Sequence, residues 1–230
     1  MSFSGRRSLA FPPDSWSLQW YRNFFTDEVW MSSLLNSVRI ALLVMVVATV
    51  LGTLASFALV RTEFKGKVVV SALIMAPLIV PGVVVAIAVF TVFLSWRMTG
   101  TMQGFVLAHS ALALPYVIIS VSAELRGFDR SLEMASMGLG AGPLATFRQV
   151  TLPAILPAVL SGALFAFIAS FDEVVVALFV QSPTLRTLPV QMYSSVTTDI
   201  DPTIAAASTM TLLLTTVVLT VVGITRKDKV

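Results

Sequence analysis

Long uncharged stretches alternate with short polar segments along this chain. Reading from one charged residue to the next gives five such stretches of 21 to 29 residues: Ile40–Val60, Val68–Trp96, Met98–Ala123, Gln149–Phe171 and Pro202–Thr225. About 20 apolar residues in a helix cross the roughly 30 Å hydrocarbon core of a bilayer. Lipid offers no partner to exposed backbone amides, and the period-two alternation of a membrane barrel is not visible. The pattern predicts an all-α membrane protein with five transmembrane helices.

Composition supports a membrane protein and excludes several classes of function. Of the 230 residues, 57% are hydrophobic and only 12% are charged, with a mean hydropathy of +0.90; soluble domains average about 25% charged residues. The absence of cysteine excludes disulfide scaffolds, cysteine-ligated zinc and thiol catalysis. The net charge of +3 is too small and too scattered for a nucleic-acid interface. No nucleotide-binding loop, zinc-protease motif or hydrolase motif is present, so we expect no catalytic residue, metal or cofactor.

The longest uncharged stretch carries a helix-breaking run at its middle. Pro77 and Pro81 are followed by Gly82, and proline both removes an intrahelical hydrogen bond and kinks a helix. The run indicates an irregular segment that lines a pathway. The alternative is an ordinary kink, because transmembrane helices tolerate proline.

Lysine and arginine predict the orientation of the helices. If successive spans alternate in direction, nine basic residues fall on one face and six on the other, and the richer face is cytoplasmic by the positive-inside rule. The carboxyl terminus is then cytoplasmic and the amino terminus is outside. We expect residues 1–35 to be an extracytoplasmic segment, 36–225 the transmembrane domain and 226–230 a cytoplasmic tail.

The longest cytoplasmic segment, residues 124–148, predicts a compact helical elbow. Leu132, Ala135 and Leu139 place one apolar stripe on a short helix, with Asp129 or Ser131 as its N-cap. A run of Gly138, Gly140, Gly142 and Pro143 then ends that helix, and residues 144–147 start a new turn. Such an elbow offers a surface for a partner protein, although periodicity alone does not distinguish it from an ordinary helical loop.

Asp172 and Glu173 are the second informative feature, because apolar residues flank them on both sides. Charges within a membrane segment are costly and usually functional. They either line a solute pathway or lie at the extracytoplasmic interface, since the 23 residues from Gln149 already cross the bilayer. The single histidine, His109, lacks companions for a metal site, and we expect it to form a hydrogen bond with a neighbouring helix.

Several separated motifs resemble one family. Residues 133–141, EMASMGLGA, with Thr151-Leu152-Pro153 resemble the Glu-Ala-Ala signature of permease subunits of binding-protein-dependent ABC importers. More narrowly, the chain is similar to the spermidine/putrescine (polyamine) branch in residues 125–133, 170–175, 188–189 and 201–206.

The resemblance implies a type I ABC importer permease architecture in which the elbow is a coupling helix gripped by an ATPase. It assigns this role to Glu133, Ala135, Gly140, Leu152 and Pro153. Met134 and Ser136 stand where the signature has Glu and Ala, which weakens the expected grip. The family typically has a sixth helix at the amino end, so either that helix is dispensable here or the start of the chain was placed too late.

The resemblance also implies the partners and the solute. We expect a second permease subunit, two cytoplasmic ATPase subunits that use ATP, an extracytoplasmic solute-binding protein and the lipid of a bacterial inner membrane. The solute would be a polyamine such as putrescine or spermidine, with Asp172 and Glu173 along its pathway. Phe171 and Tyr193 are further pathway candidates, because an aromatic ring can stack against an amine by cation–π contact, although aromatic residues near membrane interfaces are more often anchors. Two alternatives stay open: another solute, such as an iron complex, an oxyanion or thiamine, and a non-transporting docking or assembly subunit.

Overall fold

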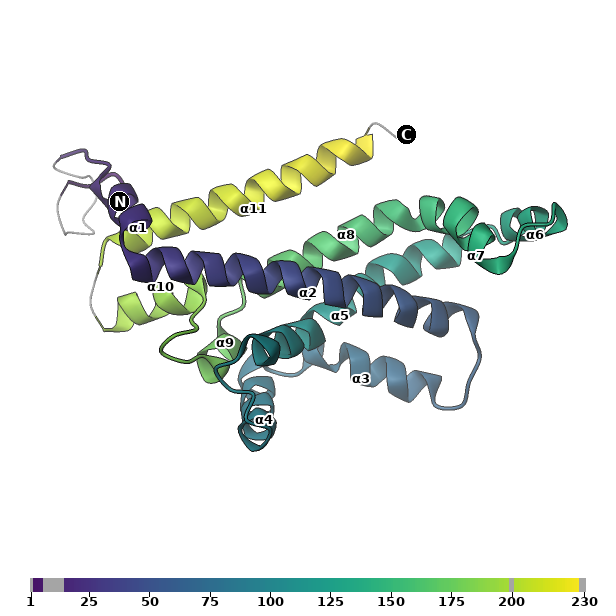
Figure 1. Ribbon diagram of the computed structural model, residues 1–230, viewed down its shortest axis with the longest axis horizontal. Coiled ribbons are helices and arrows are strands. Elements are labelled where there is room, and N and C mark those ends of the chain that lie inside the picture. The colour runs from purple at the N-terminus through teal and green to yellow at the C-terminus, as the bar shows by residue number, and fades with distance from the viewer. Residues whose placement is uncertain (1, 6–14, 199–200, 228–230) are drawn as a thin grey trace.

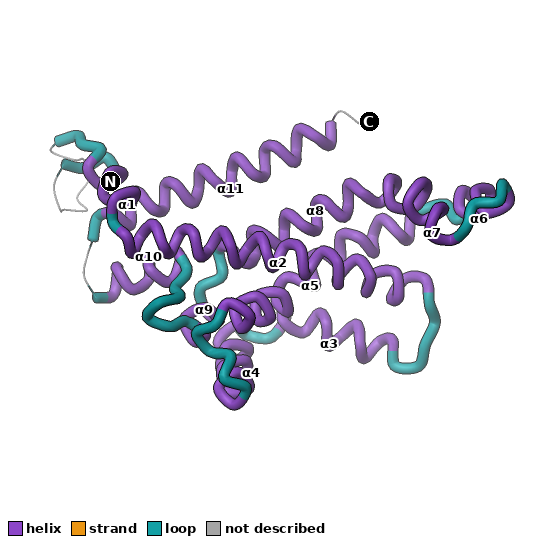
Figure 2. Tube along the Cα trace, in the orientation of Figure 1, coloured by secondary structure: helices purple, strands orange, loops and turns teal. Residues whose placement is uncertain are grey.

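The computed structural model describes residues 2–5, 15–198 and 201–227, and these residues form helices without a strand beyond one isolated bridge, between Ser4 and Trp16. Figures 1 and 2 show the arrangement. The helices are α1 (Gln19–Thr26), α2 (Glu28–Arg61), α3 (Lys67–Ile79), α4 (Gly82–Ser95), α5 (Met102–Gly127), α6 (Ser131–Gly138), α7 (Pro143–Thr146), the π-helical turn η1 (Phe147–Thr151), α8 (Leu152–Phe171), α9 (Val175–Val180), α10 (Leu188–Thr197) and α11 (Thr203–Lys227).

Helices α2, α5 and α8 form the core of the molecule, where they pack along most of their lengths. Their closest approach surrounds Val117 of α5, which is fully buried. A Cβ atom at Gly52 of α2 would lie 2.7 Å from Val117 Cβ, and one at Gly162 of α8 would lie 3.0 Å from Val117 Cα. The two glycines therefore let three helix backbones approach one another, as small residues do in membrane helix packing.

Three of the predicted spans are single helices in the described part of the chain. Glu28–Arg61, Met102–Gly127 and Pro143–Phe171 are long and apolar enough to cross a membrane. The first begins 12 residues before the predicted span because Asp27 caps it, accepting hydrogen bonds from the backbone N–H groups of Val29 at 2.8 Å and Trp30 at 3.1 Å. The gaps between charged residues thus predicted where these spans lie, whereas the N-cap at Asp27 determines where the first helix begins.

The predicted break in the second span is confirmed. Helices α3 and α4 meet at an angle of 111°, because Val80 is extended and Pro81 has no N–H to continue the helix. Pro77, by contrast, lies within α3. In Figure 1, α4 projects away from the core while α3 runs beside it.

The last predicted span corresponds to α11, whose described side chains make Thr203–Val217 a shorter apolar helix. Asp201 caps it by accepting a 2.9 Å hydrogen bond from the Thr203 N–H. Figure 1 shows α11 diverging from α2 toward its carboxyl end. With three unbroken spans, one bent pair and this helix, the count of five stays a prediction.

The end of α2 and the elbow at residues 124–148, which the alternation of spans places on the cytoplasmic face, lie at one end of the molecule. The end of α2 contacts the α6 segment directly, through Arg61 and Glu133, and Figure 1 shows α1 and α10 at the opposite end. This arrangement agrees with the alternation of spans from which the orientation was predicted. Residues 6–14 of the predicted amino-terminal segment and 228–230 of the predicted tail lie outside the described residues.

Candidate functional site

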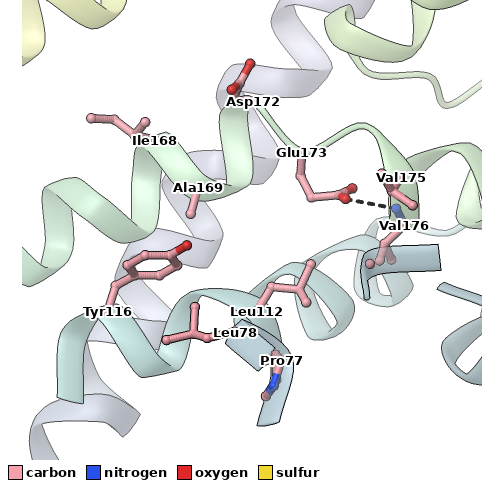
Figure 3. Close-up of a pocket in the computed structure, with 11 residues that line it drawn as sticks. Pro77, Leu78, Leu112, Tyr116, Ile168, Ala169, Asp172, Glu173, Val175 and Val176 are labelled. Carbon is pink, nitrogen blue, oxygen red and sulfur yellow. Dashed lines mark hydrogen bonds between the residues drawn. The ribbon is translucent and has the colours of Figure 1, made fainter. Parts of the chain in front are cut away.

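A cavity of about 330 Å³ lies where the broken span meets the core. Eleven residues from five helices and one link line it, and all of them except Gly82 are labelled in Figure 3: Pro77 and Leu78 of α3, Gly82 of α4, Leu112 and Tyr116 of α5, Ile168 and Ala169 of α8, Asp172 and Glu173 of the α8–α9 link, and Val175 and Val176 of α9. The predicted irregular segment and the predicted acid pair therefore share one site.

The two acids of this cavity have different environments. Glu173 accepts hydrogen bonds from the backbone N–H groups of Val176 at 2.9 Å and Ala177 at 2.8 Å, so its carboxylate caps α9. Asp172 ends α8 and is exposed. Its side chain makes no hydrogen bond or ion pair with any residue that the structure describes. In Figure 3 the two carboxylates point in different directions. One acid is thus held by the backbone and the other is free to bind a cation.

His109 stands behind Glu173 and is fully buried. Its Nδ1 shares a 3.0 Å hydrogen bond with the Ser170 hydroxyl of α8, which confirms the predicted contact with a neighbouring helix. Its Nε2 lies 3.7 Å from Glu173 Oε2 and has no hydrogen-bond partner. The imidazole therefore connects α5 with both α8 and the acid-bearing link.

Tyr116 is a cavity residue that the sequence did not single out. Its side chain is 37% exposed, and Figure 3 shows its hydroxyl directed toward α8. A lone tyrosine within a span carries no periodic or motif signal, and only the packing of α5 against α8 places it opposite the acid pair.

The two aromatic residues proposed for the pathway lie elsewhere. Phe171 is 1% exposed and stacks on Phe167, with ring centroids 5.7 Å apart. It faces a separate apolar cavity bordered by α1, α2, α10 and α11. Tyr193 lies on α10 and is 51% exposed, outside the acid-lined cavity. Neither ring lines the cavity of Asp172 and Glu173, so their pathway roles stay predictions.

The cavity combines the features that an elongated cation requires. Carboxylates at close range attract an ammonium group even at moderate dielectric, and aliphatic side chains on the other walls suit a methylene chain. A hydroxyl from Tyr116 adds a hydrogen-bonding group. Ligand cavities of this general kind, mostly apolar with a few placed polar groups, bind small molecules selectively.

The predicted elbow is present at the far end of the core. Helix α6 ends at Gly138, and α7 restarts at Pro143, close to both predicted positions. The N-cap residue of α6 is Arg130 and not the predicted Asp129 or Ser131, although Asp129 accepts a 2.9 Å hydrogen bond from the Ser131 N–H at the start of the helix. Apolar side chains cover the outer surface of the elbow without being buried by this chain: Leu132, Met134, Met137, Leu139 and Leu144. An exposed apolar group of this kind marks an interaction surface.

Of the residues assigned to coupling, Ala135 and Gly140 lie exposed on the elbow, while Leu152 and Pro153 lie at the start of α8. Gly140 has a φ angle of +90°, and a Cβ atom there would meet no atom within 4 Å. Its role is therefore conformational, since only glycine adopts this region without strain. It ends α6 and turns the chain toward α7, with its N–H donating to the Met137 carbonyl at 3.0 Å.

Glu133, which was expected to face an ATPase, turns inward instead. One carboxylate oxygen accepts a 2.7 Å hydrogen bond from Arg61 of α2, and the other accepts from the Thr151 hydroxyl. Partial desolvation raises the pKa of Glu133, but the hydrogen bonds from Thr151 and Arg61 and the charge of Arg61 outweigh it, so the pKa lies below its usual 4.5. The carboxylate is thus ionised, and both of its oxygens are bound by residues of this chain.

Known proteins match this chain over most of its length. Residues 48–228 match the family described as the binding-protein-dependent transport system inner membrane component. The chain is 38% identical to the putrescine transport system permease protein PotI of Escherichia coli K12, over 86% of this chain and 73% of the relative. It is 35% identical to the spermidine/putrescine transport system permease protein PotC of Haemophilus influenzae, over 91% and 80%.

The fold also matches a solved structure. A chain of a bacterial ABC transporter involved in the import of the acidic polysaccharide alginate superimposes with a TM-score of 0.75 at 15% identity, covering 96% of this chain and 86% of the other. At that identity the match concerns the fold, and it confirms the predicted importer permease architecture.

Proposed function

Because the chain belongs to the family of binding-protein-dependent transport system inner membrane components, we propose that it forms, with a second permease, the membrane pathway of an ATP-driven importer for a small polyamine. Putrescine and spermidine are the solutes named for the relatives at 38% and 35% identity. The chain has no nucleotide-binding loop in its sequence, so ATP is used by partner ATPase subunits.

The single observation that supports this solute is the acid-lined cavity. Asp172 and Glu173 both line this cavity, together with Tyr116 and the broken α3–α4 pair. Acidic residues between apolar segments of a membrane protein are costly and usually functional, and the Asp172 carboxylate has no hydrogen-bond or ion-pair partner among the described residues. A polyamine offers ammonium groups for the acids and methylene groups for Leu78, Leu112 and Ile168.

The partners follow from the two ends of the molecule. The exposed apolar elbow would dock on one of two cytoplasmic ATPase subunits, which places the end of α2 and the carboxyl terminus in the cytoplasm. The opposite end, with α1 and α10, would meet the extracytoplasmic binding protein. The apolar outer surface of α3 and α4, which includes Val68, Leu73 and Ile79, would contact lipid and the second permease of a bacterial inner membrane.

Reconstitution tests the proposal. The chain is placed in vesicles with the second permease and the ATPase, labelled putrescine and the binding protein are supplied outside, and ATP is supplied at the ATPase face. We expect ATP-dependent accumulation of label that unlabelled putrescine or spermidine suppresses. An excess of an oxyanion, thiamine or an iron complex should leave it unchanged. ATP-dependent accumulation of one of those solutes in place of putrescine would contradict the proposal. Binding of putrescine without its transport into the vesicles would contradict it too.

A further inference from the structure

Arg61 occupies an unusual position at the end of α2. It is the last residue of the helix, yet its side chain is only 20% exposed. Its guanidinium lies over the rings of Phe57 and Phe128, with 5.0 Å and 5.7 Å from the guanidinium carbon to the ring centroids. An arginine at a membrane boundary would ordinarily extend into water. Here two aromatic rings hold it against the protein.

The partner of Arg61 is Glu133, at a sequence separation of 72 residues. Arg61 Nη1 lies 2.7 Å from Glu133 Oε2, and the glutamate side chain is only 13% exposed. The Nε and Nη2 groups of Arg61 are buried and have no hydrogen-bond partner among the described residues. Among the described residues, Glu133 therefore supplies the one carboxylate that neutralises this guanidinium.

The second oxygen of Glu133 connects a third segment. It accepts a hydrogen bond from Thr151, which is 1% exposed and ends the π-helical turn η1 just before α8. Phe147 of the same turn packs edge-to-face on Phe57 of α2, with ring centroids 5.6 Å apart. One carboxylate thus joins α2, α6 and the start of α8.

This arrangement has a mechanical consequence for the elbow. The covalent connections of α6 run through the 128–130 link and the glycine-rich turn, and neither connects it to α2. Without the ion pair, a push on the exposed tip of the elbow would reach α2 only indirectly, through the helices that these links join. With it, displacement of α6 must move the end of α2 and the start of α8 together, since packed networks transmit displacement between discrete arrangements.

We propose that Arg61 and Glu133 are positioning residues that lock the elbow to α2 and α8, so that movement of a docked ATPase reaches two core helices. The proposal deepens the proposed importer function and rests on it. Glu133 acts within the chain, while the exposed apolar residues of the elbow contact the partner. The arrangement differs from a merely stabilising ion pair in that its loss separates ATP hydrolysis from transport.

The test measures the ratio of solute transported to ATP hydrolysed in the reconstituted complex. In Arg61→Ala we expect the ratio to fall roughly 5- to 150-fold, the usual range of coupling between sites, while ATP hydrolysis continues. Arg61→Lys keeps the charge but loses the planar stacking, so its ratio should lie between those of Arg61→Ala and the unsubstituted protein. The double variant Arg61→Glu with Glu133→Arg should recover part of the ratio.

Lys67→Ala is the matched control, because Lys67 forms a 2.9 Å ion pair with Glu63, whose side chain is 91% exposed. It removes a neighbouring cation from the same end of the molecule without touching the elbow, and we expect an unchanged ratio. An unchanged ratio in Arg61→Ala, or an equal fall in Lys67→Ala, would overturn the proposal. A loss of assembled complex in proportion to transport would indicate a purely stabilising pair and overturn it too.

A distance measurement keeps the test independent of the solute. The chain has no cysteine, so a spin label at Glu63→Cys, in the loop directly after α2, and one at Ser131→Cys, at the start of α6, report on the separation of these two segments in the complex. We expect one narrow distance distribution, unchanged by ATP binding, which Arg61→Ala broadens. If that distance changes with ATP in the unsubstituted background, the lock is absent, whether or not polyamines are transported.

Discussion

The carboxylates of the cavity and of the elbow differ in how their oxygens are satisfied. Glu133 is neutralised by Arg61 and bonded by Thr151, so every segment that it touches belongs to the same chain. At the cavity, Glu173 uses the backbone of α9, and Asp172 has no hydrogen-bond or ion-pair partner among the described residues. An occupied carboxylate connects helices, whereas an unoccupied one can bind a cation that arrives from outside.

This difference separates two roles of acidic residues, connecting helices and binding an external partner, that the sequence alone did not distinguish. Asp172 and Glu173 drew attention because apolar residues flank them, and Glu133 because it belongs to the signature motif. In both places a partner outside the chain was the natural interpretation. The structure supports an external partner for an acidic residue only at the cavity. At the elbow, exposed apolar residues offer the docking surface and the acid stabilises the shape behind it.

Neutralising both cavity acids should have the largest effect. An ammonium–carboxylate contact at 4 Å contributes about 4 kcal/mol at an effective dielectric constant of about 20, before desolvation is subtracted. We therefore expect the double variant Asp172→Asn with Glu173→Gln to reduce putrescine uptake by about tenfold or more. The amount of assembled complex and its basal ATP hydrolysis should change little.

Glu63→Gln serves as the control, because that carboxylate is almost fully exposed in the loop after α2. If the cavity variant loses folding, expression and uptake in equal measure, Asp172 and Glu173 are structural acids at the membrane interface. The contrast between the cavity and the elbow would then disappear.

The next largest effect is expected at Gly140. A residue other than glycine in the left-handed region costs roughly 1 to 2 kcal/mol, and the turn between α6 and α7 depends on the φ angle of +90° at this position. Gly140→Val should therefore lower transport per ATP by roughly 5- to 30-fold with membrane insertion intact. Transport and ATP-hydrolysis assays measure the first quantity, and the yield of membrane-inserted protein measures the second.

Gly142 provides the comparison within the same turn. It has an ordinary φ of −71°, and a Cβ atom there would meet nothing within 4 Å, so Gly142→Ala should transport as the unsubstituted protein does. Asparagine tolerates the left-handed region better than valine, and Gly140→Asn should retain more coupling. Unaltered transport in Gly140→Val would remove the assigned role of the turn.

Tyr116 should produce a smaller change at the cavity. Tyr116→Phe removes one hydroxyl and keeps the ring, and a single neutral hydrogen bond contributes about 0.5 to 1.5 kcal/mol. We expect a rise in the putrescine concentration needed for half-maximal uptake of about two- to tenfold, with little change in maximal rate. Tyr193→Phe, outside the cavity, should change neither quantity, and the opposite ranking of the two variants would favour a pathway along α10.

The smallest effect concerns acid stability at the elbow. Because the folded-state pKa of Glu133 lies below 4.5, its contribution to stability is present above that value and is lost as pH falls through the folded pKa. Glu133→Gln should abolish this part of the pH dependence. Melting temperatures of the purified complex between about pH 6 and pH 3 measure it, and identical acid profiles for variant and parent would contradict the assigned ion pair.

Much of the fold could be predicted because membrane helices follow directly from the distribution of charge. Gaps between charged residues located the spans, and Pro81 located the bend, since a missing N–H acts on its own helix. The elbow also follows from local chemistry, as Gly138, Gly140 and Pro143 end and restart helices without help from distant residues.

The rest depends on contacts between residues far apart in the sequence. Nothing near Glu133 indicates that Arg61, on another helix, turns its carboxylate inward. Tyr116 joins the acid pair only because α5 packs against α8 around Val117. Phe171 was assigned to the pathway because an aromatic ring can stack against an amine, but its ring packs on Phe167 and borders the apolar cavity next to α2 and α11 instead.

Cysteine protection tests the central claim most directly. Ala169 lines the cavity, and the chain has no cysteine of its own, so Ala169→Cys gives one reporter thiol beside the acids. With putrescine delivered by the binding protein, modification of this thiol by a positively charged reagent should slow markedly, while a thiol at Tyr193→Cys should react as before. Equal rates at Ala169→Cys with and without putrescine would show that the cation does not occupy the cavity of Asp172 and Glu173.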